Sequence, residues 1–463
     1  QNAEGLTTAP RQVTAQGGHY YVRLGDDGTG LHAAPRSTPP AGRAGLKLWL
    51  NAGAGAASAG GTPASDGTAV QSWRDQSDHA HLATQASAAN MPTYVASVAN
   101  LNHQPALSFD GNDSLGGTLA EFATNPNMSV FVVWDRDGTG TQAPFAIGSS
   151  TSAHGSIGVG WNSAGHYNIF QWSGPEGRVY STAAEPLLET ALRNTADGNR
   201  MSVFLNGQAG TLSQTGADAN VNGAFKIGQH GHTGLAVIGK IAEVLFYDRV
   251  LNTAERIVTE NYLGAKYAIP LHASSSRFSY AAPEKGDYDF DLIGIGREAD
   301  GALTAGSAAG LAISEWNGGL SNGDYLLAAH KTTVNGLVAT RLPADMRWRW
   351  DRVWAMEMTG EADAVLSFDF TDLLAGLPES SLAALVDGST ALGLLYTATD
   401  GGDFARLDLY GAVEGDVVSF NMLGSQWADG YYTIGFIPEP SAVLLAMLGL
   451  LSFLSRRARR ANA

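Results

Sequence analysis

The sequence predicts an all-β protein made of two antiparallel β-sandwiches in succession. Over many short segments, apolar residues recur at every second position, which is the spacing of side chains on one face of a strand. Glycine is abundant, with 57 residues among 463, and charged residues make up only 16%. Because glycine adopts the backbone conformations that tight turns need, this composition favours short strands joined by turns.

Composition also limits the classes of function. The chain has no cysteine, which excludes disulfides, thiolate metal sites and cysteine nucleophiles. Its formal net charge is −16, and the last 27 residues contain four arginines and one glutamate, so the rest of the chain is more acidic still. Such a body repels nucleic acid and anionic membrane, so neither is an expected partner.

The first sandwich is expected from about residue 46 to residue 270. Residues 128–134 and 201–205 alternate as strands, and Asn206-Gly207 is a strong hairpin signal. Residues 242–246 alternate as well, with Ala242, Val244 and Phe246 expected on one face. Strands separated by Gly, Asn and Asp indicate an antiparallel sandwich.

One helix is expected at the end of this domain, from Thr253 to Tyr267. Its apolar residues follow helical spacing, and Asn252 and Glu255 are placed to form a capping box at its start. The pattern predicts a single amphipathic helix with one face on the sandwich.

Several stretches of this region resemble the laminin-G-like, concanavalin-A-type jelly roll of bacterial surface proteins. The one departure is Asp78, where the family usually has glycine, and it predicts a reshaped turn. The stretches are Leu46-Lys47-Leu48-Trp49-Leu50, Trp73-Arg74-Asp75-Gln76-Ser77, Phe109-Asp110-Gly111-Asn112-Asp113, Phe204-Leu205-Asn206-Gly207, Ile241-Ala242-Glu243-Val244-Leu245-Phe246-Tyr247-Asp248, Asn261-Tyr262-Leu263 and Lys266-Tyr267.

A second β-rich domain is expected over residues 276–436. In the segment 347–358, three tryptophans and two methionines alternate with charged residues, and 366–370 and 432–436 alternate in the same way. Residues 289–297 resemble the start of an uncharacterised module that often follows lectin-like domains. That resemblance implies a fold and no activity.

The C-terminal segment has the order of a sorting signal. Pro438, Glu439 and Pro440 precede an apolar run, 441–454, which as a helix would be roughly 21 Å long, short of a ~30 Å hydrocarbon core. Four arginines follow, and the positive-inside rule would hold them on the cytoplasmic side. The arginines are Arg456, Arg457, Arg459 and Arg460.

This arrangement closely resembles the PEP-CTERM sorting signal. The resemblance implies recognition by an exosortase-type membrane protease, cleavage near Pro438-Glu439-Pro440, and delivery to the surface or matrix of a Gram-negative bacterium, where such systems accompany exopolysaccharide. The membrane contact would be transient and made by the tail alone. The start at Gln1, without Met, is expected to be a mature N-terminus from which a signal peptide was removed.

The predicted fold is therefore an antiparallel jelly-roll β-sandwich followed by a second β-sandwich-like domain and a C-terminal sorting helix. The expected divisions are a leader or linker over 1–44, the jelly roll over 45–270, the second domain over 276–436 and the sorting signal over 437–463. A helix end, a proline and three serines between the two sandwiches predict a loosely held linker at 270–276.

Two groups of residues are candidate binding sites. Asp110 and Asp113, and Asp135 and Asp137, lie in predicted loops, and laminin-G-like domains often hold Ca²⁺ at a loop rim. The alternative is that these aspartates only form turns. The aromatic residues in the Gly-rich stretch 161–180 could stack on sugar rings, or else pack in the core. They are Trp161, Tyr167, Trp172 and Tyr180.

No catalytic constellation is recognisable in the sequence. Retaining glycosidases place two carboxyl groups about 5–5.5 Å apart, and the only similar alternation, in 284–291, has no second glutamate and lies in the second domain. We therefore expect a non-enzymatic surface or matrix protein that binds carbohydrate or another matrix component, with Ca²⁺ as the one expected cofactor. A purely structural matrix subunit and a polysaccharide-degrading enzyme are the alternatives.

Overall fold

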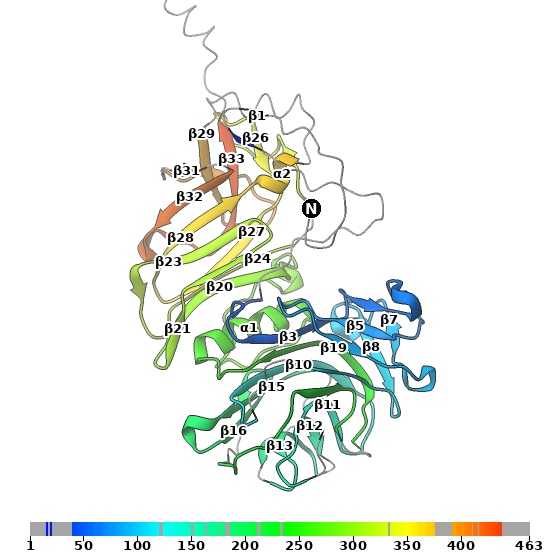
Figure 1. The fold of residues 1–463 in the computed structure, drawn as a ribbon. Coiled ribbons are helices and arrows are strands. Elements are labelled where there is room, and N and C mark those ends of the chain that lie inside the picture. Colours follow the sequence, from blue (N-terminus) through cyan, green and yellow to red (C-terminus); the bar gives the residue numbers. More distant parts are fainter. Residues whose placement is uncertain are drawn as a thin grey trace, which may run out of the picture.

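Antiparallel β-sheets make up both halves of the protein, which confirms the predicted fold class (Figure 1). The computed structural model describes residues 15–16, 19–20, 39–119, 124–149, 152–162, 164–174, 176–180, 186–210, 214–231, 235–331, 334–375, 391–409, 411–414 and 416–437. The predicted sorting helix lies outside these residues.

Two sheets form the first sandwich. One sheet lies against helix α1 (Thr253–Lys266) and is here called the helix-side sheet. Its order is β17 (Gln208–Ala209), β16 (Arg200–Leu205), β15 (Leu187–Asn194), β10 (Met128–Arg136), β19 (Ile238–Tyr247), β8 (Ala106–Asp110) and β7 (Thr93–Val95), with β3 (Leu46–Asn51) also paired to β19. The other, here called the outer sheet, has the order β14 (Glu176–Tyr180), β13 (His166–Gln171), β12 (Ile157–Asn162), β11 (Gln142–Ile147), β18 (Ala224–Ile227), β9 (Leu115–Thr118), β6 (Leu82–Thr84), β5 (Ser72–Arg74) and β4 (Ala56–Ala57).

Short elements complete the description. A two-stranded pair joins β1 (Ala15–Gln16) to β2 (His19–Tyr20). The single-turn 3₁₀ helices are η1 (Ala59–Gly61), η2 (Ala88–Asn90), η3 (Ala99–Leu101), η4 (Thr195–Asp197), η5 (Pro283–Lys285) and η6 (Gly424–Gln426).

The central strand β10 shows why the two-residue spacing was informative. Val130, Val132 and Trp134 point into the core between the sheets, as predicted, while Phe131 and Val133 point to the opposite face and are equally buried. Both faces are buried because α1 covers the outside of this sheet. Without a helix on the outside of the sheet, only the face toward the other sheet would be apolar, and the outer face of β10 would be polar.

The strand β19 corrects one expectation. Val244 and Phe246 face the inter-sheet core, but Ala242 faces the opposite side, so the three do not share a face. The cause is a β-bulge: Val133 pairs with Glu243 and Trp134 pairs with Ile241, which leaves Ala242 unpaired. An extra residue reverses the alternation, and here it directs Glu243 toward the helix.

The hairpin at Asn206-Gly207 is confirmed. Leu205 pairs with Gln208 across the turn, and Asn206 and Gly207 have φ of 49° and 77°. Both values lie in the left-handed region, which the type I′ hairpin turn requires and which Asn and Gly adopt most readily. The Asn206 side chain also accepts a hydrogen bond from the Leu188 backbone N–H at 2.8 Å.

Helix α1 (Thr253–Lys266) is confirmed together with its capping box. The Asn252 side chain accepts from the Glu255 N–H at 2.9 Å, and the Glu255 carboxylate accepts from the Asn252 N–H at 2.9 Å. The helix differs from the prediction in one respect, because residues on every side of it are buried. Its polar face, expected in water, is covered by the second sandwich.

Glu243 joins the helix to the strands beneath it. Its carboxylate accepts from Trp49 Nε1 at 2.6 Å, Tyr262 Oη at 3.1 Å, Lys266 Nζ at 2.6 Å and Tyr267 Oη at 2.7 Å. The Glu243 side chain is completely buried. The segments around 49, 243 and 262–267, which are far apart in sequence, are thus tied by one carboxylate.

The second sandwich also has two sheets. Its larger sheet has the order β21 (Gly301–Leu303), β20 (Phe290–Glu298), β24 (Tyr325–His330), β27 (Trp354–Thr359), β33 (Gly430–Ile437), β26 (Trp348–Trp350) and β25 (Leu337–Val338), with β29 (Ala391–Thr397) paired to β33 and to β30 (Ala405–Arg406). The smaller sheet has the order β22 (Ala305–Ala308), β23 (Leu311–Leu320), β28 (Ala362–Asp369), β32 (Val417–Met422) and β31 (Ala412–Glu414), and the short helix α2 (Thr371–Ala375) follows β28.

The tryptophan-rich segment of the second sandwich is two strands and not one. Residues 348–350 and 354–359 form β26 and β27, which lie on either side of β33. Their tryptophans and methionines nevertheless pack into one core, as the alternation predicted. The residues of that core from this segment are Trp348, Trp350, Trp354, Met356 and Met358.

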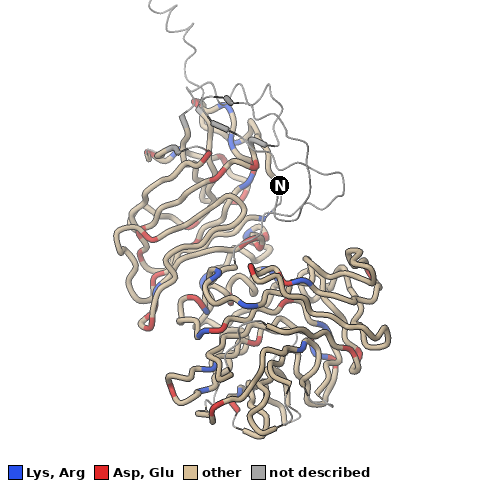
Figure 2. Tube along the Cα trace, in the orientation of Figure 1, with Lys and Arg blue, Asp and Glu red and all other residues tan. Residues whose placement is uncertain are grey.

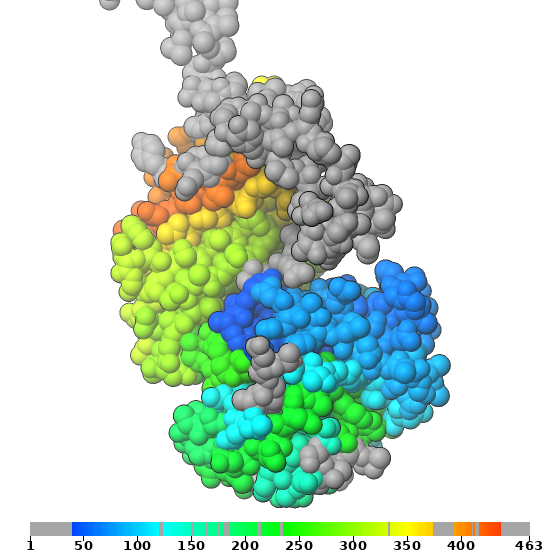
Figure 3. Space-filling model, viewed as in Figure 1, coloured from blue at the N-terminus to red at the C-terminus, as the bar shows by residue number. Residues whose placement is uncertain are grey.

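The two sandwiches share a continuous cluster of buried apolar side chains. The space-filling view shows the two halves of the chain in contact on the visible face (Figure 3). Buried side chains of α1, such as Ile257, belong to the same cluster as Leu292 and Leu327 of the second sandwich. Polar contacts surround it: Asn102 Nδ2 donates to Asp289 Oδ2 at 2.6 Å, and the Thr253 hydroxyl donates to Asp300 at 2.9 Å. The second domain is therefore packed on the helix.

The linker at 270–276 is not loose, and the prediction for it is wrong. Ser275 is completely buried; its hydroxyl donates to the Gly207 carbonyl at 3.0 Å, and its own carbonyl accepts from Asn261 Nδ2 at 2.7 Å. The backbone N–H of His272 donates to the Asn206 carbonyl at 2.8 Å. The linker is thus held along the first sandwich by the same hairpin turn that the sequence identified.

We expect the linker to resist proteolysis in the folded protein. Treatment with a protease of broad specificity should leave 270–276 uncut, because cleavage needs the backbone to leave its partners. Thermal unfolding should show one transition for residues 45–436, since the shared apolar cluster couples the two sandwiches. A cut in this segment together with two separate transitions would show that the interface is weak.

Candidate functional site

A shallow groove lies at the β13–β14 end of the first sandwich. Its volume is about 300 Å³. The strands β13 and β14 and the turn between them supply most of the lining. The described residues that line it are Thr141, Asn168, Phe170, Gln171, Trp172, Ser173, Gly174, Glu176 and Leu235.

Aromatic rings form one wall of the groove. The ring of His230 stacks on Trp172, with centroids 5.6 Å apart, and meets the ring of Phe170 in a tilted arrangement, with centroids 5.2 Å apart. His230 is completely buried, whereas Trp172 is partly exposed. The stack therefore fixes the Trp172 ring at the edge of the groove, with part of its surface available to a ligand.

Amide and carboxylate groups form the polar part of the lining. Asn168 Nδ2 donates to Glu176 Oε2 at 2.7 Å, and Arg178 lies 3.3 Å from the other oxygen of Glu176. The Gln171 side chain is 1% exposed, and neither its Oε1 nor its Nε2 has a hydrogen-bond partner among the described residues. Buried polar atoms are nearly always paired, so this amide calls for a partner that the described chain does not supply.

A buried carboxyl group lies inside the sandwich near the same strands. Glu189 of β15 is completely buried, and burial raises its pKa well above the ordinary value. The Trp134 indole and the backbone of Asn168 and Gly160 act in the opposite direction. We therefore expect Glu189 to be uncharged at neutral pH, as a carboxyl without a cationic partner in an apolar core should be.

The four aromatic residues singled out in the sequence are in different environments. Trp172 lines the groove. Tyr167 is 1% exposed and packs in the core between the rings of Trp134 and Trp161. Trp161 is half-buried, with the Arg136 guanidinium 4.0 Å from its ring centroid. Of Tyr180 the structure describes only the backbone, which pairs with His166.

The predicted aspartates gather at one rim of the first sandwich, because β8 and β10 flank the start of β19. Asp110 and Asp113 hold their own turn: Asp113 Oδ2 accepts from the Asp110 N–H at 3.1 Å, and Asp110 Oδ1 accepts from the Asn112 N–H at 3.0 Å. Burial raises the pKa of Asp113 to about 6, and the charge of Asp110 adds to the rise.

Asp135 and Asp137 share a cationic partner. Lys240 Nζ lies 3.3 Å from Asp135 and 3.4 Å from Asp137. Burial lowers the pKa of Lys240, but the two carboxylates raise it more. Among the residues that the structure describes, no group of three or more histidine, aspartate or glutamate side chains is placed to hold a metal ion. Binding of Ca²⁺ at this rim stays a prediction.

Trp172 is the one lining residue that was singled out in the sequence. The other eight are Thr141, Asn168, Phe170, Gln171, Ser173, Gly174, Glu176 and Leu235. Residues of these types are ordinary in strands and turns, so nothing in their spacing marked them. The available signal was the neighbouring run of aromatic residues, which did locate the strands that form the groove.

The C-terminal segment matches a known sorting signal. Residues 436–460 match the family described as the PEP-CTERM protein-sorting motif, which confirms the motif predicted from Pro438-Glu439-Pro440 and the arginines that follow. The match implies an exported protein whose tail is processed by exosortase. In the described part of the chain, no helix combines the length and apolar character needed to cross a membrane, and the run 441–454 lies outside that part.

Several solved structures resemble part of the chain at low similarity. Domain 4 of AbnA, a GH43 extracellular arabinanase from Geobacillus stearothermophilus in complex with arabinotriose, is 15% identical with a TM-score of 0.31, covering 45% of this chain and 95% of that one. The Ruminococcus gnavus IT-sialidase CBM40 bound to alpha2,3 sialyllactose is 10% identical with a TM-score of 0.23, over 28% and 80%. A Trypanosoma rangeli sialidase is 18% identical with a TM-score of 0.35, over 50% and 35%. At such low TM-scores these likenesses do not bear on what the chain binds. No curated protein sequence matches it significantly.

Proposed function

We propose that this exported protein acts at the cell surface or in the extracellular matrix of a Gram-negative bacterium, where it binds carbohydrate through the groove at β13 and β14. The sorting motif supports the location, because exosortase processing occurs on exported chains. The amide of Gln171, which has no hydrogen-bond partner among the described residues, lies beside the partly exposed ring of Trp172 and carries the proposal for the ligand. A sugar offers both an apolar ring face for the indole and hydroxyl groups for the amide.

We also propose that the first sandwich is a jelly roll of the laminin-G-like kind. The resemblance was based on separate stretches of sequence, and Glu243 now connects three of them through Trp49, Tyr262 and Lys266. In the second stretch, the buried Asp75 accepts from the Trp49 N–H at 2.8 Å and from the Ser77 N–H at 2.8 Å. These motif residues therefore form one structural unit, which supports the reading of the motif as a fold signature.

The lining of the groove supports binding of a glycan without its hydrolysis. Glycoside hydrolysis by the usual mechanism needs two carboxyl groups on either side of the scissile bond. Glu176 is the one carboxylate among the described residues that line the groove, and Asn168 and Arg178 already engage it. Its role in the proposal is to accept hydrogen bonds from sugar hydroxyls.

We expect Trp172→Ala to weaken glycan binding by about tenfold or more, because the substitution removes the exposed part of an indole on which a sugar ring can stack, and tryptophan is among the residues that typically dominate binding energies. The purified full chain should first be tested on a glycan array, and the hits then titrated by calorimetry. Glu176→Gln should weaken binding less, since it keeps the shape of the side chain. Trp348→Ala is the matched control, because it also removes a half-buried tryptophan but lies in the second sandwich.

The array separates the three functions. Specific hits that Trp172→Ala removes support carbohydrate binding at the groove. No hits on any glycan favour a structural matrix subunit without a ligand. Shortened oligosaccharides in the incubation mixture would show a polysaccharide-degrading enzyme and overturn the proposal.

A further inference from the structure

A second pocket lies in the larger sheet of the second sandwich and has a different chemical character from the groove. Its volume is about 170 Å³, roughly that of six water molecules at ~30 Å³ each. The space admits one charged group with the ring atoms next to it. Three cations (Lys331, Arg341 and Arg349) and two carboxylates (Asp351 and Asp400) line it, an excess of one positive charge.

This local excess contrasts with the protein as a whole. The chain carries a formal net charge of −16, and acidic side chains are spread over both sandwiches (Figure 2). A pocket that gathers three cations in such a chain concentrates positive potential where the surroundings oppose it. An anion in the pocket is therefore attracted by the nearby cationic side chains, whereas the net negative charge of the whole protein repels it.

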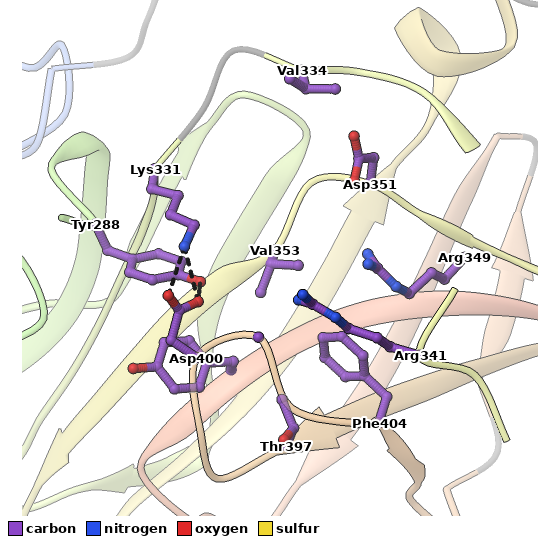
Figure 4. Close-up of a pocket in the computed structure, with 12 residues that line it drawn as sticks. Tyr288, Lys331, Val334, Arg341, Arg349, Asp351, Val353, Thr397, Asp400 and Phe404 are labelled. Atoms are coloured by element: carbon purple, nitrogen blue, oxygen red, sulfur yellow. Dashed lines mark hydrogen bonds and ion pairs between the residues drawn. The ribbon is translucent and has the colours of Figure 1, made fainter. Parts of the chain in front are cut away.

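The Lys331–Asp400 pair closes one side of the pocket (Figure 4). Lys331 Nζ donates to both oxygens of Asp400, at 2.9 and 2.7 Å, and Tyr288 Oη donates to the same carboxylate at 2.8 Å. Burial raises the pKa of Asp400, but the bonds from Lys331 and Tyr288 lower it more. This carboxylate is therefore fully engaged, and the two arginines carry the charge that remains.

The two guanidinium groups point into the same space. Figure 4 shows Arg341 and Arg349 both extended toward Val353, beside the Phe404 ring. Arg349 is 5% exposed; its Nε donates to the Thr340 carbonyl and its Nη1 to the Trp350 carbonyl, while Nη2 donates to none of the described residues. Burial lowers the pKa of Arg349, Asp351 raises it, and the charge of Arg341 lowers it further.

Arg341 is held in an unusual position. Its φ is 57°, in the left-handed region that residues with a Cβ adopt at an energetic cost. Its guanidinium lies against Gly401, where a Cβ would be 3.2 Å from Arg341 Nη1, and within the described chain no side chain or backbone group accepts a hydrogen bond from it. Arg341 is exposed, and its charge helps to lower the pKa of Asp400. A strained backbone that places an exposed cation next to a buried one is an arrangement expected of an anion site.

We propose that this pocket binds the carboxylate of an acidic sugar residue, such as a hexuronate, between Arg341 and Arg349. Guanidinium groups match a planar carboxylate geometrically through paired N–H donors. One carboxylate neutralises the single excess charge. The Asp351 carboxylate, which lies beside Arg349 in Figure 4, can accept from a sugar hydroxyl, which a simple apolar acid would not provide.

This inference rests on the proposed function, because it names acidic glycans as the class that the protein binds. Sodium glucuronate should bind the full chain with a dissociation constant of about millimolar, whereas glucose should not bind at this site. Arg341→Gln should weaken glucuronate binding by about tenfold or more, since it removes charged hydrogen bonds. Arg347→Gln is the matched control, because Arg347 is exposed, stacks on Trp348 and does not line the pocket.

The outcomes distinguish this site from the groove. Glucuronate binding that survives Trp172→Ala but not Arg341→Gln supports the second site. If sodium sulfate binds as tightly as glucuronate, the pocket is a general anion site and the assignment to a sugar is wrong. If glucuronate does not bind while neutral glycans still bind on the array, the inference fails and the proposed function stands.

Discussion

Replacing Glu243 with alanine should lower the free energy of unfolding by about 3–5 kcal/mol. The substitution removes the one carboxylate that accepts from Trp49, Tyr262, Lys266 and Tyr267, and it leaves the Lys266 ammonium, which is 14% exposed, without its anion. Breaking a buried charge pair by deleting one partner is among the most costly of single substitutions. Urea unfolding followed by circular dichroism measures the loss.

The controls separate charge from shape. Glu243→Gln keeps the size of the side chain and one acceptor oxygen, but it replaces the other oxygen with an NH₂ donor that faces other donors, so we expect a loss between zero and that of alanine. Glu284→Ala removes a glutamate that is exposed on η5 and should change the stability by no more than about 0.5 kcal/mol. If Glu243→Ala costs less than about 1 kcal/mol, the network does not hold the helix on the sheet.

Local features of this fold were predictable because their causes are local. The capping box of α1 depends on residues three positions apart, and the hairpin turn depends on the dipeptide Asn206-Gly207. Alternation identified the core face of β10 for the same reason, since each residue's direction follows from its neighbour's. Each of these features depends only on residues that are a few positions apart in the sequence.

Non-local features were not predictable in this way. The bulge at Ala242 depends on how β19 pairs with β10, and burial of the polar face of α1 depends on the second sandwich. A charged pair such as Arg256 and Glu260, four residues apart, reads as a solvated helix face. In the structure it is buried, with Nη1 and Oε2 2.6 Å apart. The linker was wrongly predicted for the same reason, because the partners of Ser275, the Gly207 carbonyl and the Asn261 side chain, are distant in sequence.

The candidate sites show the same division. The aromatic stretch in the sequence located the strands of the groove, but of its four members only Trp172 is seen to line it. The pocket in the second sandwich is lined by Lys331, Arg341, Arg349 and Asp400, which belong to separate segments that only the fold brings together. The spacing of residues in the sequence does not predict which distant residues become neighbours when strands pair.

Changing Pro438, Glu439 and Pro440 together to alanine should abolish processing of the tail. The matched sorting motif covers 436–460, and the Pro-Glu-Pro element is the part of it next to the folded domain. We expect cleavage near this element, so that the processed protein ends close to residue 440 and the triple variant keeps its full mass and stays in the membrane fraction. Intact-mass analysis of the surface and membrane fractions of the producing bacterium measures both forms.

Variants of the arginines then test why the tail stops in the membrane. The apolar run is short, so its orientation should depend on the cationic cluster that follows it. Replacing Arg456, Arg457, Arg459 and Arg460 with lysine keeps the charge and should leave processing intact, whereas replacing all four with alanine should prevent retention in the membrane and hence cleavage. A surface form that still contains Arg460 by mass would contradict the sorting mechanism, because the tail would then have been carried through uncut.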